Sequence, residues 1–437
     1  MGLLKAGWSR IAITPEIGTR LTGFSAREGL ATGVHDDLYV RSLVIESEDR
    51  AVALVSVEVL ALAGDFIAAV KQDISRRTGI PAANILIACT HTHSGPVTIK
   101  TFFNPEETVE DAYMARLGAA IEQSVAEAWE RRAPALAGWG AARVTGVGVN
   151  RRDPEHGYVD EDASILKISG AGAAASAVVI HYACHPTVLG PNNLLVTGDF
   201  PSFALEEVER STGAFAMFFN GAQGDVSMGH SSELSAVGVI APGRTFERAA
   251  EMGARLAEAV LAELPRIHTG SVTLDAGLVA MELPLKSYPP TEELSREARI
   301  AEERLASLAG RGTDDVELRQ AKMQALFASI EGVLADANRE YPACVMPLEL
   351  QGVRIGDTLL AGLPAEAFAE VGQRMKRASG SKILVVGLAN GYIGYVPCRP
   401  AYAEGGYEIV SSRTTPEAED TLATAAARLA SALFQER

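Results

Sequence analysis

The chain has 437 residues, of which 47% are hydrophobic and 22% are charged. This composition is typical of a folded globular protein with a large core, and it excludes a chain that is mostly disordered. The net charge of −16, from 39 Lys and Arg against 55 Asp and Glu, argues against the basic surface that binds nucleic acids or anionic membranes.

No stretch of the sequence has the features of a membrane-spanning or targeting segment. The longest apolar run, Ala51–Leu62, is interrupted by Ser56 and Glu58, whereas a transmembrane helix needs about 20 apolar residues. The first residues have neither the apolar core nor the small-residue cleavage site of a signal peptide. Four widely spaced cysteines form no Cys-x-x-Cys pair and are interpreted as free thiols. We therefore expect a cytoplasmic protein without an integral membrane segment.

Apolar runs of strand length alternate with amphipathic helical segments, which predicts an α/β fold. The predicted strands, in chain order, are Ala51–Leu60, Ile85–Thr90, Ala177–Cys184, Ala214–Asn220, Asp357–Ala361 and Ile383–Leu388. The predicted helices among them are Asp65–Thr78, Tyr113–Trp129 and Arg244–Leu264. We expect mixed β-sheets flanked by helices, with the active site at the strand ends.

Residues 291–340 differ in composition from the rest of the chain. They are rich in Glu, Ala, Arg and Leu with a helical period, and a Gly-Arg-Gly-Thr sequence interrupts them at 310–313. This pattern predicts a helical hairpin inserted into a single catalytic domain that spans residues 1–437.

Two histidine-bearing motifs follow predicted strands. In ILIACTHTHSGP, His91 and His93 point the same way if the strand continues, and such a pair suits zinc or a similar metal. Neighbouring groups can equally satisfy such a pair without a metal. In VVIHYACHPT, His185 lies at a strand end that Pro186 terminates. His181 is four strand residues or about 13 Å away, too far to share an ion, so His185 is the better ligand candidate.

Further polar motifs follow other strands. FFNGAQGDVS runs into a glycine-rich loop that can present the hydroxyl of Ser227, although an Asx-type turn explains the motif equally well. LLAGLPAEAF predicts a helix with Glu366 in its first turn, either as a partner of the helix dipole or as a carboxylate ligand. Four tyrosines, which can donate to a developing oxyanion, cluster after the last predicted strand: Tyr392, Tyr395, Tyr402 and Tyr407. A metal hydrolase requires such convergence of distant segments.

Taken in order, five motifs resemble the neutral/alkaline (non-lysosomal) ceramidase family: HTHSGP, CHPT followed by TGD, NGAQGDVS, the segment ending in GQRM, and NGYIGY with GGYE. The N-terminal ITP…LTGFSARE…TGVHDDLYVRSLVI also matches, so the resemblance covers most of the chain. It implies a zinc-dependent amide hydrolase that cleaves an N-acyl bond, with ceramide split into a sphingoid base and a fatty acid.

The resemblance also implies roles for individual residues. The zinc ligands it implies are His91, His185, Glu366 and Tyr395. The residues it places on the substrate are the catalytic Ser227, His93 as a contact, Tyr407 on the scissile amide, and Arg151, beside Arg152. Either Ser227 attacks directly to form an acyl-enzyme, or it assists a water activated by zinc.

Departures from the family bear on the substrate. Met228 stands where family members have Pro, and neither the C-terminal immunoglobulin-like domain nor the secretory signal of many members is recognisable. A zinc hydrolase of a small soluble amide or ester is therefore the alternative to a ceramidase. A zinc- or lipid-binding protein without activity is a third hypothesis, but a pure binder would not need Ser227 in addition to the ligands.

Overall fold

The computed structural model describes residues 4–48, 50–170, 174–310 and 315–434. Within these ranges, three sheets of four or five strands form the body. The first has the order β5-β4-β3-β1-β6, with β1 (Lys5–Ala12), β3 (Tyr39–Glu46), β4 (Ala51–Val57), β5 (Ile85–Cys89) and β6 (Ala133–Pro134). The second has the order β12-β10-β9-β7, with β7 (Leu136–Arg143), β9 (Asp162–Ser169), β10 (Ala175–Tyr182) and β12 (Phe215–Asn220). The third has the order β14-β15-β16-β18, with β14 (Leu274–Pro284), β15 (Val345–Ile355), β16 (Thr358–Gly362) and β18 (Lys382–Val386).

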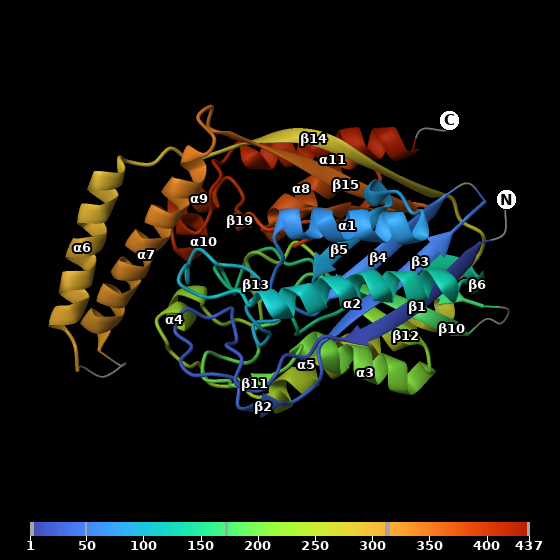
Figure 1. Ribbon diagram of the computed structural model, residues 1–437, viewed down its shortest axis with the longest axis horizontal. Helices are drawn as coiled ribbons and strands as arrows, with labels where there is room; N and C mark the ends of the chain where they lie inside the picture. Colours follow the sequence, from blue (N-terminus) through green and yellow to red (C-terminus); the bar gives the residue numbers. More distant parts are fainter. Residues whose placement is uncertain (1–3, 49, 171–173, 311–314, 435–437) are drawn as a thin grey trace.

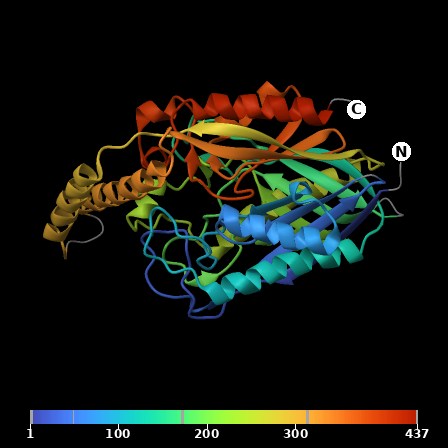
Figure 2. The same ribbon diagram turned by 45° about the horizontal axis from the view of Figure 1, so that its top comes forward.

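A pair of helices covers the outer face of each sheet (Figures 1 and 2). Helices α1 (Gly64–Thr78) and α2 (Asp111–Glu130) pack on the first sheet. Helices α3 (Phe200–Thr212) and α5 (Phe246–Glu263) cover the second, and α8 (Ala369–Ser379) and α11 (Ala418–Phe434) cover the third. The inner faces of the three sheets meet in one apolar cluster, to which they contribute, among others, Leu54, Phe219 and Leu360. Strands buried on both faces are continuous apolar runs, and the α/β class predicted from these runs is confirmed.

The described residues contain a β-strand–helix–β-strand unit in each sheet. In these units β4 pairs in parallel with β5, β10 with β12, and β16 with β18, and the intervening helices are α1, α3 and α8. Parallel neighbours share the edge at which their carboxyl ends emerge. The loops after these strands are therefore gathered at one end of the body.

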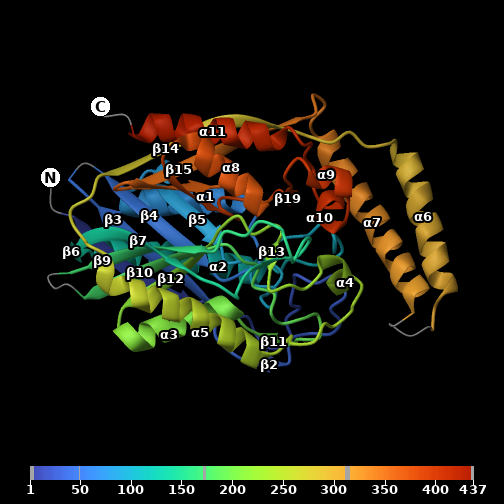
Figure 3. The same ribbon diagram turned by 180° about the vertical axis from the view of Figure 1, so that it is seen from behind.

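Short two-stranded ribbons connect those loops. They are β2 (Gly33–Val34) with β11 (Leu195–Val196), β8 (Val149–Asn150) with β13 (Val226–Ser227), and β17 (Glu366–Ala367) with β19 (Tyr395–Val396). The short helices α4 (Ser232–Ala236), α9 (Ala401–Glu404) and α10 (Tyr407–Val410) lie at the same end (Figure 3).

Two long helices occupy the segment expected to form a helical hairpin. They are α6 (Thr291–Ser307) and α7 (Val316–Arg339), which pack against each other and project from the body beside α10 (Figures 1 and 3). Positions 311–313 of the predicted Gly-Arg-Gly-Thr break lie outside the described residues. Among the helices that the structure describes, none combines the length and the apolar character needed to cross a bilayer.

Two local predictions are wrong. Strand β5 ends at Cys89, so strand alternation does not orient His91 and His93. Glu366 lies in β17 rather than in the first turn of a helix, because its backbone N–H donates to the carbonyl oxygen of Gly394 at 3.0 Å. Helix α8 begins only at Ala369.

Candidate active site

The ends of the parallel strands bring the predicted metal ligands together. His91 follows β5, His185 follows β10, Glu366 follows β16 and Tyr395 follows β18. Strands β17 and β19 pair in parallel with Glu366 opposite Tyr395. Each of the four side chains is almost completely buried.

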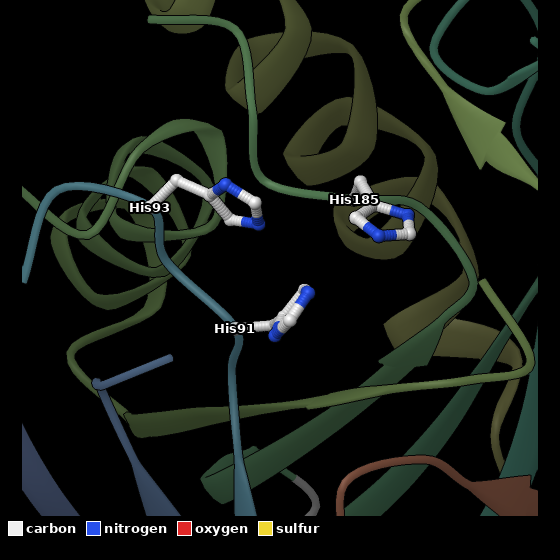
Figure 4. A group of neighbouring side chains, drawn as sticks. All are labelled: His91, His93 and His185. Atoms are coloured by element: carbon white, nitrogen blue, oxygen red, sulfur yellow. The ribbon is translucent and has the colours of Figure 1, made fainter. Parts of the chain in front are cut away.

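His91 adopts a backbone conformation that is rare for a residue with a side chain. Its φ is 75°, and its backbone N–H donates to the carbonyl oxygen of Val59 at 3.0 Å. Such strain persists only where the surroundings hold it, and it is concentrated at functional sites. The turn brings the His91 ring within 4.8 Å of the His93 ring and 5.0 Å of the His185 ring, measured between centroids (Figure 4).

Backbone carbonyl groups fix the tautomers of His91 and His185. The Nδ1 atom of His91 lies 2.8 Å from the carbonyl oxygen of Leu60, and that of His185 lies 2.7 Å from the carbonyl oxygen of Gln223. A carbonyl oxygen only accepts, so both Nδ1 atoms carry a hydrogen, and in the neutral form of either ring the lone pair on Nε2 faces the site. This arrangement is common among metal-binding histidines.

The two lone pairs face the same carboxylate oxygen. Glu366 Oε2 lies 2.8 Å from His185 Nε2 and 3.3 Å from His91 Nε2. Burial, together with the positive charge of Arg151, lowers the pKa of His185 to about 4 although Glu366 acts in the opposite direction, which favours the neutral ring. Three acceptors at these distances repel one another unless a cation lies among them. The donor set of two imidazoles and a carboxylate fits zinc.

The ring of His93 lies close to the rings of His91 and His185. The candidate ligand nitrogens of His91, His93 and His185 all lie within 4.8 Å of one another (Figure 4). Neither ring nitrogen of His93 has a hydrogen-bond partner among the described residues. The ring packs against Phe24 at 4.9 Å and against the bare backbone of Gly23, where an added Cβ would lie 2.6 Å from His93 Cγ. The geometry therefore presents His93 both to the metal position and to the cavity.

The two adjacent arginines, Arg151 and Arg152, have different partners in the structure. The buried Arg151 side chain donates from Nε to Glu408 Oε1 at 2.8 Å, and from Nη2 to the carbonyl oxygen of Gly224 at 2.8 Å and to Tyr395 Oη at 3.1 Å. Arg152 points outward to Glu404 and to the other oxygen of Glu408. Arg151 therefore lies at the site and holds a predicted ligand, whereas Arg152 supports it from outside.

Ser227 lies on β13, next to a residue whose backbone is hydrogen-bonded to His185. Its neighbour Val226 accepts the backbone N–H of His185 at 2.9 Å. The Ser227 hydroxyl is buried, donates to the carbonyl oxygen of His230 at 3.4 Å and accepts from the backbone N–H of Gly229 at 3.3 Å. Both hydrogen bonds are long, so the hydroxyl is held only weakly in its present orientation.

Tyr392 and Tyr407 also belong to this group of side chains. Tyr407 begins α10, and its ring lies 6.1 Å from the Tyr395 ring, as expected if the two tyrosines act at one site. Tyr392 donates to Glu366 Oε1 at 2.7 Å. The sequence placed Tyr392 in the tyrosine cluster but gave it no role, and Glu408 was not identified because nothing in the motif shows that a carboxylate is buried there.

A cavity of about 50 Å³ opens onto most of these groups, but Ser227 and His185 are not among its lining residues. Its lining includes His91, His93, Arg151, Glu366, Tyr395 and Tyr407, together with Phe24, Phe103, His230 and Arg244. A larger groove of about 1170 Å³ lies between α1 and the β14–β15 pair, but it contains no predicted site residue. The small cavity is therefore where the chemistry can occur.

Comparison with known proteins agrees with the motifs. The family model described as neutral/alkaline non-lysosomal ceramidase, N-terminal, matches residues 5–231. The neutral ceramidase of Mycobacterium tuberculosis (strain ATCC 25618 / H37Rv) is 25% identical over 89% of this chain and 70% of its own length. That of Pseudomonas aeruginosa (strain PAO1) is 25% identical over 90% of this chain and 66% of its own length.

Solved structures show the same fold. A ceramidase complexed with C2 aligns with a TM-score of 0.75 and 20% identity, over 99% of this chain and 75% of that chain. The crystal structure of neutral ceramidase from Pseudomonas aeruginosa aligns with a TM-score of 0.75 and 21% identity, over 100% of this chain and 76% of that chain. The resemblance inferred from the motifs is confirmed: the chain belongs to the neutral/alkaline non-lysosomal ceramidase family and is an amide hydrolase acting on an N-acyl bond.

Proposed function

We propose that this chain is a zinc-dependent hydrolase of N-acyl amides and that ceramide, the substrate typical of the family, is its first candidate substrate. The observation that carries the zinc assignment is the carboxylate oxygen of Glu366, which faces the Nε2 lone pairs of both His91 and His185. Tyr395, in register with Glu366, is the fourth proposed ligand. Zinc bound there would polarise the amide carbonyl and stabilise the negative charge that develops on its oxygen.

The chain's own groups perform the remaining tasks in this proposal. Ser227 supplies the nucleophilic hydroxyl: its oxygen bonds to the carbonyl carbon, the C–N bond breaks, and the serine proton leaves with the amine. Water then hydrolyses the acyl-enzyme, which releases the acid and restores the hydroxyl. Tyr407 donates to the scissile amide, and His93, which lines the same cavity, contacts the substrate. Arg151 holds Tyr395 in place through its hydrogen bond to the phenol oxygen.

Replacing Ser227 by alanine is expected to lower kcat on the order of 10³-fold or more while the zinc content stays unchanged. The hydroxyl makes only two long hydrogen bonds, so its loss leaves the surrounding ribbon in place. Rapid acid quench of the wild-type protein followed by mass spectrometry should find the acyl group on Ser227. If turnover is fast and no acylated serine is ever trapped, direct attack is wrong and Ser227 only assists a water molecule.

The role of His93 is tested by comparing metal content with turnover. His93→Ala is expected to keep its zinc and to lose kcat/KM on the order of 10²-fold, whereas His91→Ala loses both. His181→Asn is the matched control, since this buried histidine donates to the carbonyl oxygen of Val385 at 2.8 Å and lies outside the cluster. Loss of zinc from His93→Ala would show that this ring is a ligand instead.

One observation favours the smaller substrates as a second candidate. The cavity of about 50 Å³ holds only a few water molecules, so its walls must open for any substrate, and the two long chains of a ceramide require a much larger opening than a small amide. Small soluble amides or esters need far less space. Acid release from ceramide and from a short-chain amide, measured side by side, decides between the two.

A further inference from the structure

The cavity wall contains a second buried guanidinium group that takes no part in the chemistry proposed above. Arg244 is 7% exposed and lines the cavity. Its Nη1 donates to the carbonyl oxygens of Thr187 at 3.2 Å and Leu189 at 3.1 Å, and its Nη2 donates to the hydroxyl of Ser235. Its Nε is buried and has no hydrogen-bond partner among the described residues.

Arg244 lacks an ion-pair partner in the part of the chain that the structure describes. The described residues contain no carboxylate within ion-pair distance of it, whereas Arg151 in the same cavity is paired with Glu408. Asp199 is the acidic group whose charge acts on Arg244. Its oxygens, however, accept the backbone N–H groups of Val188, Leu189 and Phe200. A buried charge without a counter-charge is costly, so its presence in a cavity wall indicates an anionic ligand.

Arg244 lies close enough to the histidines to act on the same molecule. Its guanidinium carbon is 5.5 Å from the centre of the Phe24 ring, and the His93 ring is 4.9 Å from that centre. His230 lines the same wall, and its Nε2 is also buried without a partner. The same cavity wall thus contains two histidines of the cluster, Phe24, and two buried nitrogens without a partner in the described part of the chain, Arg244 Nε and His230 Nε2.

We propose that Arg244, assisted by His230, binds a carboxylate that the substrate carries a few bonds from the scissile amide. The preferred substrates are then small N-acyl amides with a free carboxylate, on the amine side as in an N-acyl amino acid or on the acyl side as in the monoamide of a dicarboxylic acid. The guanidinium group suits this task because its planar N–H groups match both oxygens of a carboxylate. The inference rests on the proposed amide hydrolysis and narrows its substrate class.

The test uses substrate pairs that differ only in charge. N-hexanoylglycine is compared with N-hexanoylglycinamide, and N-propylsuccinamic acid with N-propylsuccinamide, using the zinc-loaded wild-type protein. We expect kcat/KM to be at least about 30-fold higher for the acid than for the carboxamide in one of the pairs. In Arg244→Gln this preference should fall below about threefold while kcat/KM for the carboxamide changes little, and Arg244→Lys should keep part of it.

Direct binding gives a second readout that does not need turnover. Calorimetry should show the acid of the preferred pair binding to wild type at least about tenfold more tightly than its carboxamide, with the difference lost in Arg244→Gln. Equal rates and equal binding for acid and carboxamide in both pairs would overturn the carboxylate site. If ceramide or the carboxamides are nonetheless hydrolysed, amide hydrolysis itself stands. Tighter binding of the acid without release of product from any amide supports the site and contradicts the proposed reaction.

Discussion

Glu366→Ala is expected to lose its bound zinc and its activity together. The alanine removes the oxygen that faces His91 Nε2 and His185 Nε2 and leaves the hydroxyl of Tyr392 without its acceptor. We expect the zinc content to fall from about one per chain to less than about a tenth, and turnover to fall on the order of 10³-fold. Metal analysis of the purified variant, read beside acid release, checks this result.

Two further variants sharpen the test. Glu366→Gln keeps the shape of the side chain and an oxygen that accepts from Tyr392, but it loses the negative charge. Its zinc content should therefore be as low as that of Glu366→Ala. Glu370→Ala, an exposed carboxylate in the first turn of α8, is the matched control and should keep both zinc and turnover. Full zinc content in Glu366→Ala with unchanged activity would show that the metal, if any, binds elsewhere.

Arg151→Ala is expected to destabilise the protein far more than Arg152→Ala. Removal of Arg151 leaves Glu408, which is 1% exposed, without its shortest ion pair and frees the Tyr395 hydroxyl. Loss of one partner of such a buried pair typically costs about 3–5 kcal/mol, whereas a more exposed pair such as Arg152 with Glu404 contributes about 1 kcal/mol or less. Chemical denaturation of both variants measures the difference.

Activity should likewise be lost in Arg151→Ala and largely kept in Arg152→Ala. Arg151→Lys is also expected to be inactive, because one ammonium group cannot donate to Glu408, Gly224 and Tyr395 at once as the planar guanidinium does. Arg152→Ala should retain most of its turnover. Equal loss of stability and activity in the two alanine variants would contradict the assignment of Arg151 rather than Arg152 to the site.

The sequence predicted the six parallel-paired strands of the three sheets and missed the strands of those sheets that pair only antiparallel. Strands β4, β10 and β16 are buried on both faces and are therefore continuous apolar runs that are easily recognised. Strands β7 and β14 contain several Gly and Ala residues and expose alternate side chains, so their composition does not distinguish them from loops. Their positions depend on pairing with distant strands, which no local pattern records.

The grouping of the four proposed metal ligands was predictable from the family resemblance, whose motifs are ordered along the chain. His91, His185, Glu366 and Tyr395 were named from four separate segments, and the structure brings their side chains into one group. The local geometry was not predictable. His91 is held in a left-handed conformation and Glu366 is held in β17 by its pairing with β19, and both depend on contacts far along the chain.

Arg244 shows what motif analysis cannot find. It follows Pro-Gly at the start of a predicted helix, where an arginine is ordinarily a solvated surface residue. Only the fold shows that it is buried beside Phe24 without a counter-charge. A group of this kind is found by following hydrogen bonds, since its unusual feature is a missing partner.

The measurement that tests the central claim most directly is the release of free acid from N-acyl amides by the purified, zinc-loaded chain. The panel contains long-chain ceramide, N-hexanoylglycine and a simple hexanoyl ester, with Ser227→Ala as the blank. We predict acid release from at least one of the amides that disappears in Ser227→Ala and on removal of zinc. Absence of acid release from every amide, or release that persists after zinc is removed, would contradict a zinc-dependent amide hydrolase.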